Sequence, residues 1–143
     1  MSINKIFIVD DDRFYTHILE SKLNNIGNFS IEKYYTGFEC LDQAHTQPDI
    51  IFLDHHLGDT TGFEILKEIK STYPNVHVVM LSGQKEMKIA VSSLRSGATD
   101  YLLKDIDDNE KKLNEIIQDC AQISKVRAKV QGKMKRKLFS FFF

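Results

Sequence analysis

The sequence has few cysteines and no long apolar run. Its 143 residues include only Cys40 and Cys120, too few for the disulfide framework that stabilises small secreted domains. Neither the N-terminal Met-Ser-Ile-Asn-Lys nor any later stretch has the apolar length of a signal peptide or a membrane span. We therefore expect an intracellular, cytoplasmic protein in which both cysteines are buried thiols.

Internal repeats and Pro/Gly/Ser-rich linkers are also missing, and the length is that of one domain. Acidic residues are missing from one segment. Residues 125–143 hold seven Lys/Arg and no Asp/Glu, a net charge of +7, whereas residues 1–124 hold 12 Lys/Arg against 20 Asp/Glu, a net charge of −8. We predict an acidic domain over residues 1–123 and a basic helical extension with an aromatic tail over residues 124–143.

Short apolar runs alternate with segments of helical period along most of the chain. The runs predict strands near residues 4–9, 29–34, 49–53, 76–81 and 99–103. The helical segments lie near residues 12–26, 37–46, 61–72, 85–96 and 108–137. This alternation is typical of an α/β fold, a doubly wound parallel sheet with helices on both faces.

Apolar residues at three- and four-residue spacing predict the buried faces of the helices. In the first helix they are Phe14, Ile18, Leu19, Leu23 and Ile26, and in the fourth they are Met87, Ala90, Val91 and Leu94. The stripe of the last helix continues beyond the compact domain, through Val126, Val130, Met134 and Leu138. A helix over 108–137 would be roughly 45 Å long, so part of it should protrude or meet a partner.

Polar residues stand where the predicted strands end. They are Asp10 and Asp11 after the first strand, Asp54 after the third, Ser82 after the fourth and Lys104 after the fifth. A parallel sheet brings the carboxyl ends of its strands to one edge, where ligands of open α/β folds bind. We expect these side chains to share one pocket.

Three carboxylates in one pocket oppose one another's ionisation, which leaves two remedies, protonation or a bound cation. An oxygen-only set, with no Cys or His at ligand spacing, favours Mg²⁺. With Mg²⁺ present, one carboxylate could attack phosphorus and form an aspartyl phosphate. Asp54 is the best nucleophile because it stands alone after its apolar run, while Lys104 and Ser82 would contact the phosphoryl oxygens.

Four motifs together resemble a known family. They are Val9-Asp10-Asp11, Leu53-Asp54, Leu81-Ser82-Gly83 and the segment from Gly97 to Lys104. In their order and approximate spacing, over residues 3 to about 122, the chain resembles the receiver domain of two-component response regulators. The resemblance implies a flavodoxin-like (βα)5 sheet of strand order 2-1-3-4-5.

The resemblance also implies the site residues. Asp54 would be the phosphoacceptor for a histidine kinase or phosphotransfer protein. Mg²⁺ would be held by Asp10, Asp11, Asp54 and the main-chain carbonyl of His56. Lys104 would pair with a phosphoryl oxygen, and Ser82 and Tyr101 would be the switch residues.

Such a protein would be a stand-alone signalling switch whose output is a changed surface for binding a downstream protein. It would catalyse only its own phosphoryl transfer and dephosphorylation. One departure concerns the lysine. The family usually has a proline after it, joined by a cis peptide, but here Asp105 follows. A cis bond before a non-proline residue is costly, so the state of the Lys104–Asp105 bond stays open.

Two other functions fit parts of the sequence. A degenerate receiver could act as a phosphorylation-independent binding or dimerisation module through its last helix. A haloacid-dehalogenase-type phosphatase also uses an aspartate nucleophile and Mg²⁺, but it requires an acid two residues later, where this chain has His56. The basic, aromatic tail is either a frayed end or a segment that docks to a protein groove, a second copy or an anionic membrane surface. DNA binding is not expected, because too few residues remain for a helix-turn-helix.

Overall fold

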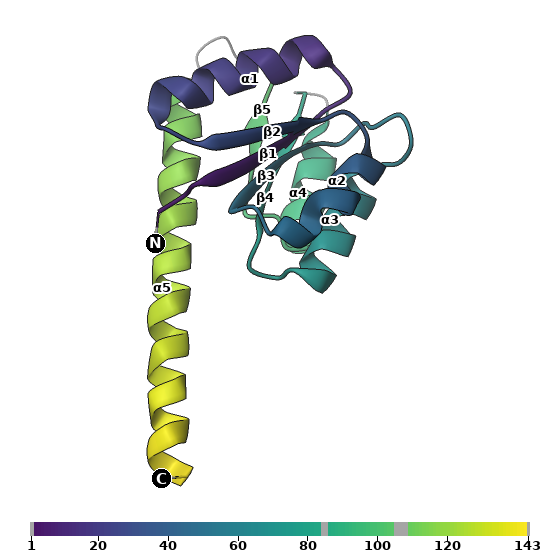
Figure 1. The fold of residues 1–143 in the computed structure, drawn as a ribbon. Coiled ribbons are helices and arrows are strands. Elements are labelled where there is room, and N and C mark those ends of the chain that lie inside the picture. The colour runs from purple at the N-terminus through teal and green to yellow at the C-terminus, as the bar shows by residue number, and fades with distance from the viewer. Residues whose placement is uncertain (1, 84–85, 105–108, 143) are drawn as a thin grey trace.

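The computed structural model of the chain describes residues 2–83, 86–104 and 109–142. Five parallel strands form one sheet in the order β2-β1-β3-β4-β5, as Figure 1 shows. The strands are β1 (Lys5–Val9), β2 (Ser30–Tyr34), β3 (Ile50–Asp54), β4 (His77–Ser82) and β5 (Asp100–Leu103). The helices are α1 (Arg13–Ile26), α2 (Gly37–Gln43), α3 (Gly62–Thr72), α4 (Met87–Arg95) and α5 (Glu110–Phe142), with a 3₁₀ turn at Ala44–Thr46. The predicted fold class and strand order are confirmed.

The strands alternate their side chains between two hydrophobic cores. Ile6 and Ile8 of β1 join the core that includes α1 and α5 residues. Phe7 and Val9 of the same strand join the core that includes α2 and α3 residues. Because successive strand residues point to opposite faces, a strand covered on both sides must be apolar throughout. This requirement explains the uninterrupted apolar runs of β1, β3 and β4.

The boundaries differ little from those predicted, except in the last helix. Each strand begins one residue later than predicted, and α5 extends to Phe142, five residues beyond the predicted end. The predicted second helix is split, since α2 ends at Gln43 and a 3₁₀ turn follows, before Pro48. The two cysteines are buried and free, as predicted.

Two of the predicted buried stripes are wrong in part. Phe14 is 74% exposed, and the neighbouring Tyr15 is buried in its place. In α4 the prediction is correct for Ala90 alone. Met87, Val91 and Leu94 of that helix are exposed. Helical spacing locates an apolar stripe, but only the packing of α1 and α4 on the sheet decides which flank of that stripe is covered.

The body holds the middle of α5 at the edge of the sheet formed by the amino ends of the strands. His77, the first residue of β4, is buried, and its Nε2 lies 2.8 Å from Oγ of Ser124 in α5. Its Nδ1 lies 3.1 Å from Oγ1 of Thr99. Arg127 donates a hydrogen bond to the carbonyl of Asn75 at 3.2 Å. Beyond these contacts α5 projects away from the sheet (Figure 1).

Among the described residues, no helix has the combined length and apolar character needed to cross a membrane. The peptide bond between Lys104 and Asp105 lies outside the described residues, so the structure does not bear on its cis or trans state.

Candidate functional site

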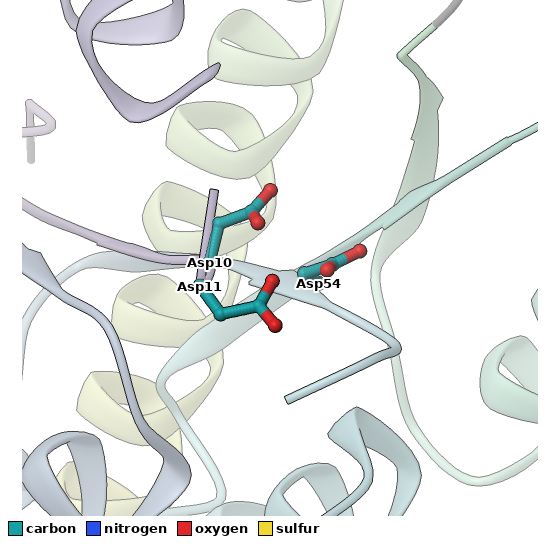
Figure 2. Close-up of side chains that lie close together, drawn as sticks. All are labelled: Asp10, Asp11 and Asp54. Atoms are coloured by element: carbon teal, nitrogen blue, oxygen red, sulfur yellow. The ribbon is translucent and has the colours of Figure 1, made fainter. Parts of the chain in front are cut away.

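Three carboxylates meet at the carboxyl edge of the sheet, as predicted. Asp10 and Asp11 follow β1, and Asp54 ends β3. One carboxylate oxygen from each lies within 4.8 Å of the others, and Figure 2 shows the three side chains on the same side of the strand ends. Asp10 and Asp54 are buried, whereas Asp11 is exposed. The cluster is therefore a half-open acidic pocket.

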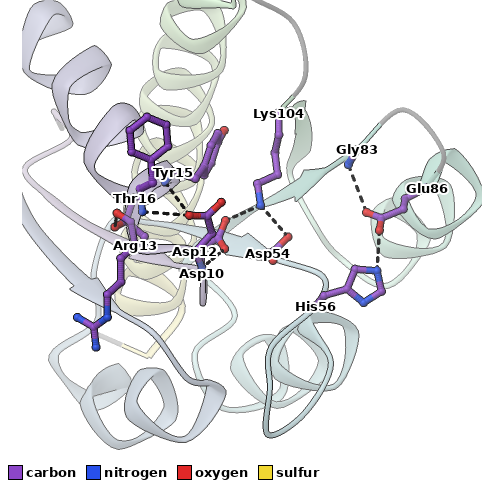
Figure 3. A network of polar contacts seen from close by, with 11 residues as sticks. Asp10, Asp12, Arg13, Tyr15, Thr16, Asp54, His56, Gly83, Glu86 and Lys104 are labelled. Atoms are coloured by element: carbon purple, nitrogen blue, oxygen red, sulfur yellow. Dashed lines mark hydrogen bonds and ion pairs between the residues drawn. The ribbon is translucent and has the colours of Figure 1, made fainter.

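The backbone after β1 fixes the orientation of Asp10. Its Oδ1 accepts a hydrogen bond from the backbone N–H of Asp12 at 2.9 Å. Asp12 in turn caps α1, because its Oδ1 accepts hydrogen bonds from the N–H groups of Phe14 and Tyr15. Burial raises the pKa of Asp10, although the Lys104 ammonium opposes that rise. The first turn of α1 thus holds this carboxylate in place (Figure 3).

Asp54 has a strongly perturbed acidity. Burial, and then the negative charge of Asp10, raises its pKa to about 7, against the lowering effect of Lys104. A buried carboxylate beside a second one is costly to ionise. In the absence of a further cation, part of the Asp54 population is protonated at neutral pH.

Lys104 supplies the positive charge of the site. Its Nζ lies 2.7 Å from Oδ2 of Asp10 and 3.4 Å from Oδ1 of Asp54. Burial acts to lower its pKa, but the two carboxylates outweigh burial and the pKa is raised. The ammonium also lies 4.6 Å from the ring centroid of Tyr15, a cation–π distance. The structure therefore places Lys104 at the acidic cluster.

Tyr15 and Glu86 are two contacts of the site that the sequence analysis missed. Tyr15 was hidden because the predicted stripe of α1 included its neighbour Phe14. No pattern in the sequence singles out Glu86, because it contacts His56, a residue 30 positions earlier in the chain. Its Oε1 lies 2.6 Å from Nε2 of His56, and its Oε2 accepts a hydrogen bond from the N–H of Gly83 at 3.3 Å.

His56 does not bring its side chain into the acidic cluster. The imidazole points toward Glu86 (Figure 3) and is largely exposed. The backbone of His56 pairs with Thr61 in an isolated antiparallel bridge. The neighbouring His55 has its pKa lowered, first by burial and then by the adjacent His56.

Ser82 ends β4 beside Asp54. The register pairs Asp54 with Leu81, and the carbonyl of Ser82 accepts a hydrogen bond from the N–H of Lys104 at 2.9 Å. The Oγ of Ser82 is buried and has no hydrogen-bond partner among the described residues. A buried hydroxyl without a partner is costly, so this group has a hydrogen bond left to make.

The start of α3 is packed tightly against Asp54. A Cβ atom on Gly62 would lie 2.2 Å from the carbonyl oxygen of Asp54, so only glycine fits. The N–H of Gly62 also donates to the carbonyl of His55 at 2.7 Å. This contact closes the loop after the candidate nucleophile.

Tyr101 lies in β5, opposite Met80 of β4. It is partly buried and packs against the core that contains α2 and α3 residues. The sequence analysis singled it out as a switch residue, and the structure gives it a half-buried aromatic ring in the last strand of the sheet.

The donor set fits a hard divalent cation. The three carboxylates are all oxygen ligands, and Asp11 is open to solvent. Mg²⁺ prefers one or two carboxylates together with water. Asp10, Asp11 and Asp54 are the residues that could hold it.

Comparison with known proteins identifies the family. The model of the response regulator receiver domain matches residues 6–118. The transcriptional regulatory protein ZraR of Klebsiella oxytoca is 31% identical over 109 residues, which cover 76% of this chain and 24% of that protein. The DNA-binding transcriptional regulator NtrC of Klebsiella pneumoniae is 34% identical over 105 residues, which cover 73% of this chain and 22% of that protein.

A solved structure agrees with the sequence matches. The receiver domain of NtrX from Brucella abortus aligns with a TM-score of 0.75 at 27% identity, covering 82% of this chain and 98% of that domain. The chain thus spans less than a quarter of the length of the two matched regulators. The part that matches is the receiver domain, and these relatives are response regulators rather than classical enzymes.

Proposed function

The chain belongs to the response regulator receiver domain family, and from this premise we propose that it is a signalling switch with Asp54 as its phosphoacceptor. The donor would be a histidine kinase or a phosphotransfer protein. The output would be a changed surface for binding a downstream protein. We assign this function to residues 1–123 and treat residues 124–143 as a separate extension.

One observation carries the proposal: the carboxylate of Asp54 lies beside both a second buried carboxylate and the ammonium of Lys104. In the transfer, an oxygen of the Asp54 carboxylate attacks phosphorus as the bond from phosphorus to the donor nitrogen breaks, and the donor histidine leaves as imidazole. The product is an acyl phosphate. The ammonium of Lys104 already contacts the carboxylates of both Asp10 and Asp54. It is therefore close enough to pair with an oxygen of a phosphoryl group attached to Asp54.

Asp54 can attack phosphorus only as the ionised carboxylate, so the rest of the site must favour its ionised form. With its pKa raised to about 7, a substantial part of the Asp54 population is protonated at neutral pH and cannot attack phosphorus. We propose that Asp10, Asp11, Asp54 and the main-chain carbonyl of His56 hold Mg²⁺. When bound, this ion would neutralise the acidic cluster and the negative charge of the phosphoryl group.

Ser82 and Tyr101 would report the phosphorylation. The unpartnered hydroxyl of Ser82 can donate a hydrogen bond to a phosphoryl oxygen. Because Ser82 lies in the strand next to β5, its displacement would be passed to the side of the fold that carries Tyr101. Inward movement of that ring would change the surface near α4 and β5.

A direct test uses a small phosphodonor. The purified chain is incubated with acetyl phosphate and Mg²⁺, and the acyl phosphate is located by mass spectrometry after borohydride reduction. We expect a single modified residue, Asp54, and no modification of Asp54→Asn. Asp59→Asn is the matched control, because Asp59 caps α2 through the N–H groups of Gly37 and Phe38. Modification elsewhere, or none at all with beryllofluoride also failing to bind, would disprove the switch.

The same samples address the phosphatase alternative. A haloacid-dehalogenase-type enzyme would turn over p-nitrophenyl phosphate rapidly and many times, whereas a receiver would hold its phosphoryl group and release it only through its own slow dephosphorylation. The observed residue two positions after Asp54 is His56, whose side chain contacts Glu86 rather than the acidic cluster. We expect no multiple turnover.

A further inference from the structure

The last half of α5 is a strongly basic, solvent-exposed segment that the proposed switch does not use. Every residue from 128 to 142 is exposed except Gly132, which is intermediate. Residues 125–143 carry seven Lys/Arg and no Asp/Glu. The segment from Lys125 to Phe142, which we call the basic extension, therefore offers a positive surface as far as Lys137 and ends in uncharged residues.

The basic extension also carries an apolar stripe. Its members recur at three- and four-residue intervals and are all exposed: Val126, Val130, Met134, Leu138 and Phe141, with Ile123 preceding them in the same stripe. At about 100° per residue these side chains lie on one face of the helix. Four of the seven cations, Lys125, Lys129, Lys135 and Arg136, lie away from this face, whereas Arg127 and Lys137 fall within it and Lys133 at its border. An apolar stripe with most of its Lys/Arg on the other side, and aromatic residues among the apolar ones, describes a helix suited to a lipid interface.

The aromatic residues concentrate at the far end of the helix. Phe139, Phe141 and Phe142 are exposed, and the rings of Phe141 and Phe142 pack edge to face at 5.2 Å. Residues 128–142 extend for about 22 Å, and this half of α5 projects clear of the sheet and its other helices (Figure 1). The contacts of Ser124 and Arg127 with the body hold the base of the projecting helix. The Phe-rich end can thus reach a surface without the body intervening.

We propose that the basic extension binds the surface of an anionic lipid bilayer, with Leu138, Phe141 and Phe142 in the interface and the Lys/Arg side chains at the headgroups. The charge argues for this partner over a second copy. Pairing two copies along this stripe would bring fourteen cations together, whereas helices that pair in coiled coils usually place opposite charges at their flanks. Nucleic acid would satisfy the charge but would leave the apolar stripe in water.

The proposal goes beyond the phosphorylation switch and does not depend on it. The acidic cluster follows the carboxyl ends of β1 and β3, and the end of α5 projects away from the sheet on the other side (Figure 1). Asp54→Asn should therefore bind vesicles like the unaltered chain. This variant separates a failure of lipid binding from a failure of phosphorylation.

Flotation of the full chain with vesicles tests the proposal. One set contains phosphatidylcholine alone and the other contains about one third phosphatidylglycerol. We expect binding to the anionic vesicles only, and loss of that binding as salt rises from about 0.1 to 0.5 M. Phe141→Ser with Phe142→Ser should weaken binding at least about tenfold. Phe38→Ser, which changes an equally exposed ring on α2, should have no effect.

A charge variant gives the second arm. Lys135→Gln with Lys137→Gln should weaken vesicle binding by about 30-fold, since each cation near an anionic surface contributes about fivefold. The control is Lys67→Gln with Lys112→Gln, two half-exposed lysines of the body. Circular dichroism of each variant confirms that the helix is retained.

Three outcomes would overturn the proposal. They are no binding to anionic vesicles at low salt, equal binding to neutral vesicles, and equal effects of the tail and body variants. Sedimentation and duplex-DNA binding of the same proteins then show whether the basic extension binds a second copy of the chain or nucleic acid instead. A dimer dispersed by the Phe141/Phe142 variant, without vesicle binding, would assign the stripe to a second copy. DNA binding without vesicle binding would assign the charges to nucleic acid.

Discussion

Lys104 lies closer to Asp10 than to Asp54. Its Nζ is 2.7 Å from Oδ2 of Asp10 and 3.4 Å from Oδ1 of Asp54. The lysine thus pairs more tightly with a candidate metal ligand than with the candidate nucleophile. If a divalent cation takes over the charge of Asp10, the ammonium is released toward Asp54 and whatever is attached to it. We therefore propose that Lys104 and a divalent cation compete for the carboxylate of Asp10.

Replacing Lys104 should slow phosphorylation. In Lys104→Gln the two buried carboxylates lose their ammonium partner, and no cation faces the phosphoryl oxygens from this side. We expect the rate of modification by acetyl phosphate to fall about 100-fold, a usual cost of losing one electrostatic contact to a transition state. Lys112→Gln removes a half-exposed lysine paired with Asp100 and should leave the rate unchanged. Equal rates for both variants would remove Lys104 from the proposed chemistry.

Replacing Asp54 should stabilise the fold at high pH. Its folded-state pKa, about 7, lies above the ordinary 3.8, so the folded state favours the protonated acid. The cost of ionising Asp54 in the folded state lowers the free energy of unfolding. This loss is absent below pH 3.8, grows between pH 3.8 and 7, and is complete above pH 7. In urea titrations without divalent cations at pH 8, Asp54→Asn should gain on the order of 2 kcal/mol in unfolding free energy.

That gain should shrink as the pH falls toward 4, and Mg²⁺ should reduce it at pH 8 by neutralising the cluster. Asp42→Asn, an exposed acid of α2, serves as the control and should show no such trend. A gain that is independent of pH would contradict the role of ionisation.

His77 should give the opposite pH dependence. Burial, and then the positive charges of Arg127 and Lys70, lowers its pKa to about 4 from 6.5. The folded state therefore favours the neutral imidazole. The unfolding free energy is unaffected by this group above pH 6.5, and it falls as the pH drops from 6.5 toward 4 and the unfolded chain takes up the proton. We expect the unaltered chain to lose about 2–3 kcal/mol from this group over that interval.

The variant His77→Gln should be less stable at pH 7 by about 1–2 kcal/mol, since it weakens the contacts with Thr99 and Ser124. Its unfolding free energy, measured by chemical denaturation, should also fall less steeply between pH 7 and pH 4, an interval that we call the acid limb. His45→Gln changes an exposed histidine and should retain the steeper limb. Parallel limbs for the two variants would exclude His77 as the source of the acid sensitivity.

Gly62 should tolerate no side chain. In Gly62→Ala the new Cβ would lie 2.2 Å from the carbonyl oxygen of Asp54, so the start of α3 must move. We expect a loss of about 2–3 kcal/mol in unfolding free energy and slower phosphorylation. Gly58→Ala, in the same loop, has no atom within 4 Å of the added Cβ and should be nearly neutral. Thermal unfolding of the pair measures the difference.

Ser82 should matter for phosphorylation and not for folding. Within the described part of the chain its hydroxyl is buried without a hydrogen-bond partner, and Ser93 in α4 shares that property. Ser82→Ala and Ser93→Ala should therefore both leave stability unchanged or raise it by about 1 kcal/mol. Only Ser82→Ala should reduce the change in Tyr101 fluorescence or NMR shifts on beryllofluoride binding. An unaltered response would remove Ser82 from the switch.

Much of the site could be predicted because its residues follow strands of a recognisable pattern. The apolar runs before Asp10, Asp54 and Ser82 are buried on both faces, and a buried parallel strand leaves a plain signature in the sequence. The contact of Tyr15 with Lys104 could not be predicted in the same way. It required knowing which flank of the α1 stripe faces the sheet, and periodicity leaves an uncertainty of one residue there.

The sequence by itself determined the strand order through the family resemblance, the acidic cluster and the separation of an acidic body from a basic extension, because each depends on residue types at set positions. The tertiary structure alone decided three other matters. They are the preference of Lys104 for Asp10 over Asp54, the contact of His56 with Glu86 and the exposure of the α4 stripe. Each depends on distances between elements that are far apart in the chain, and packing sets those distances.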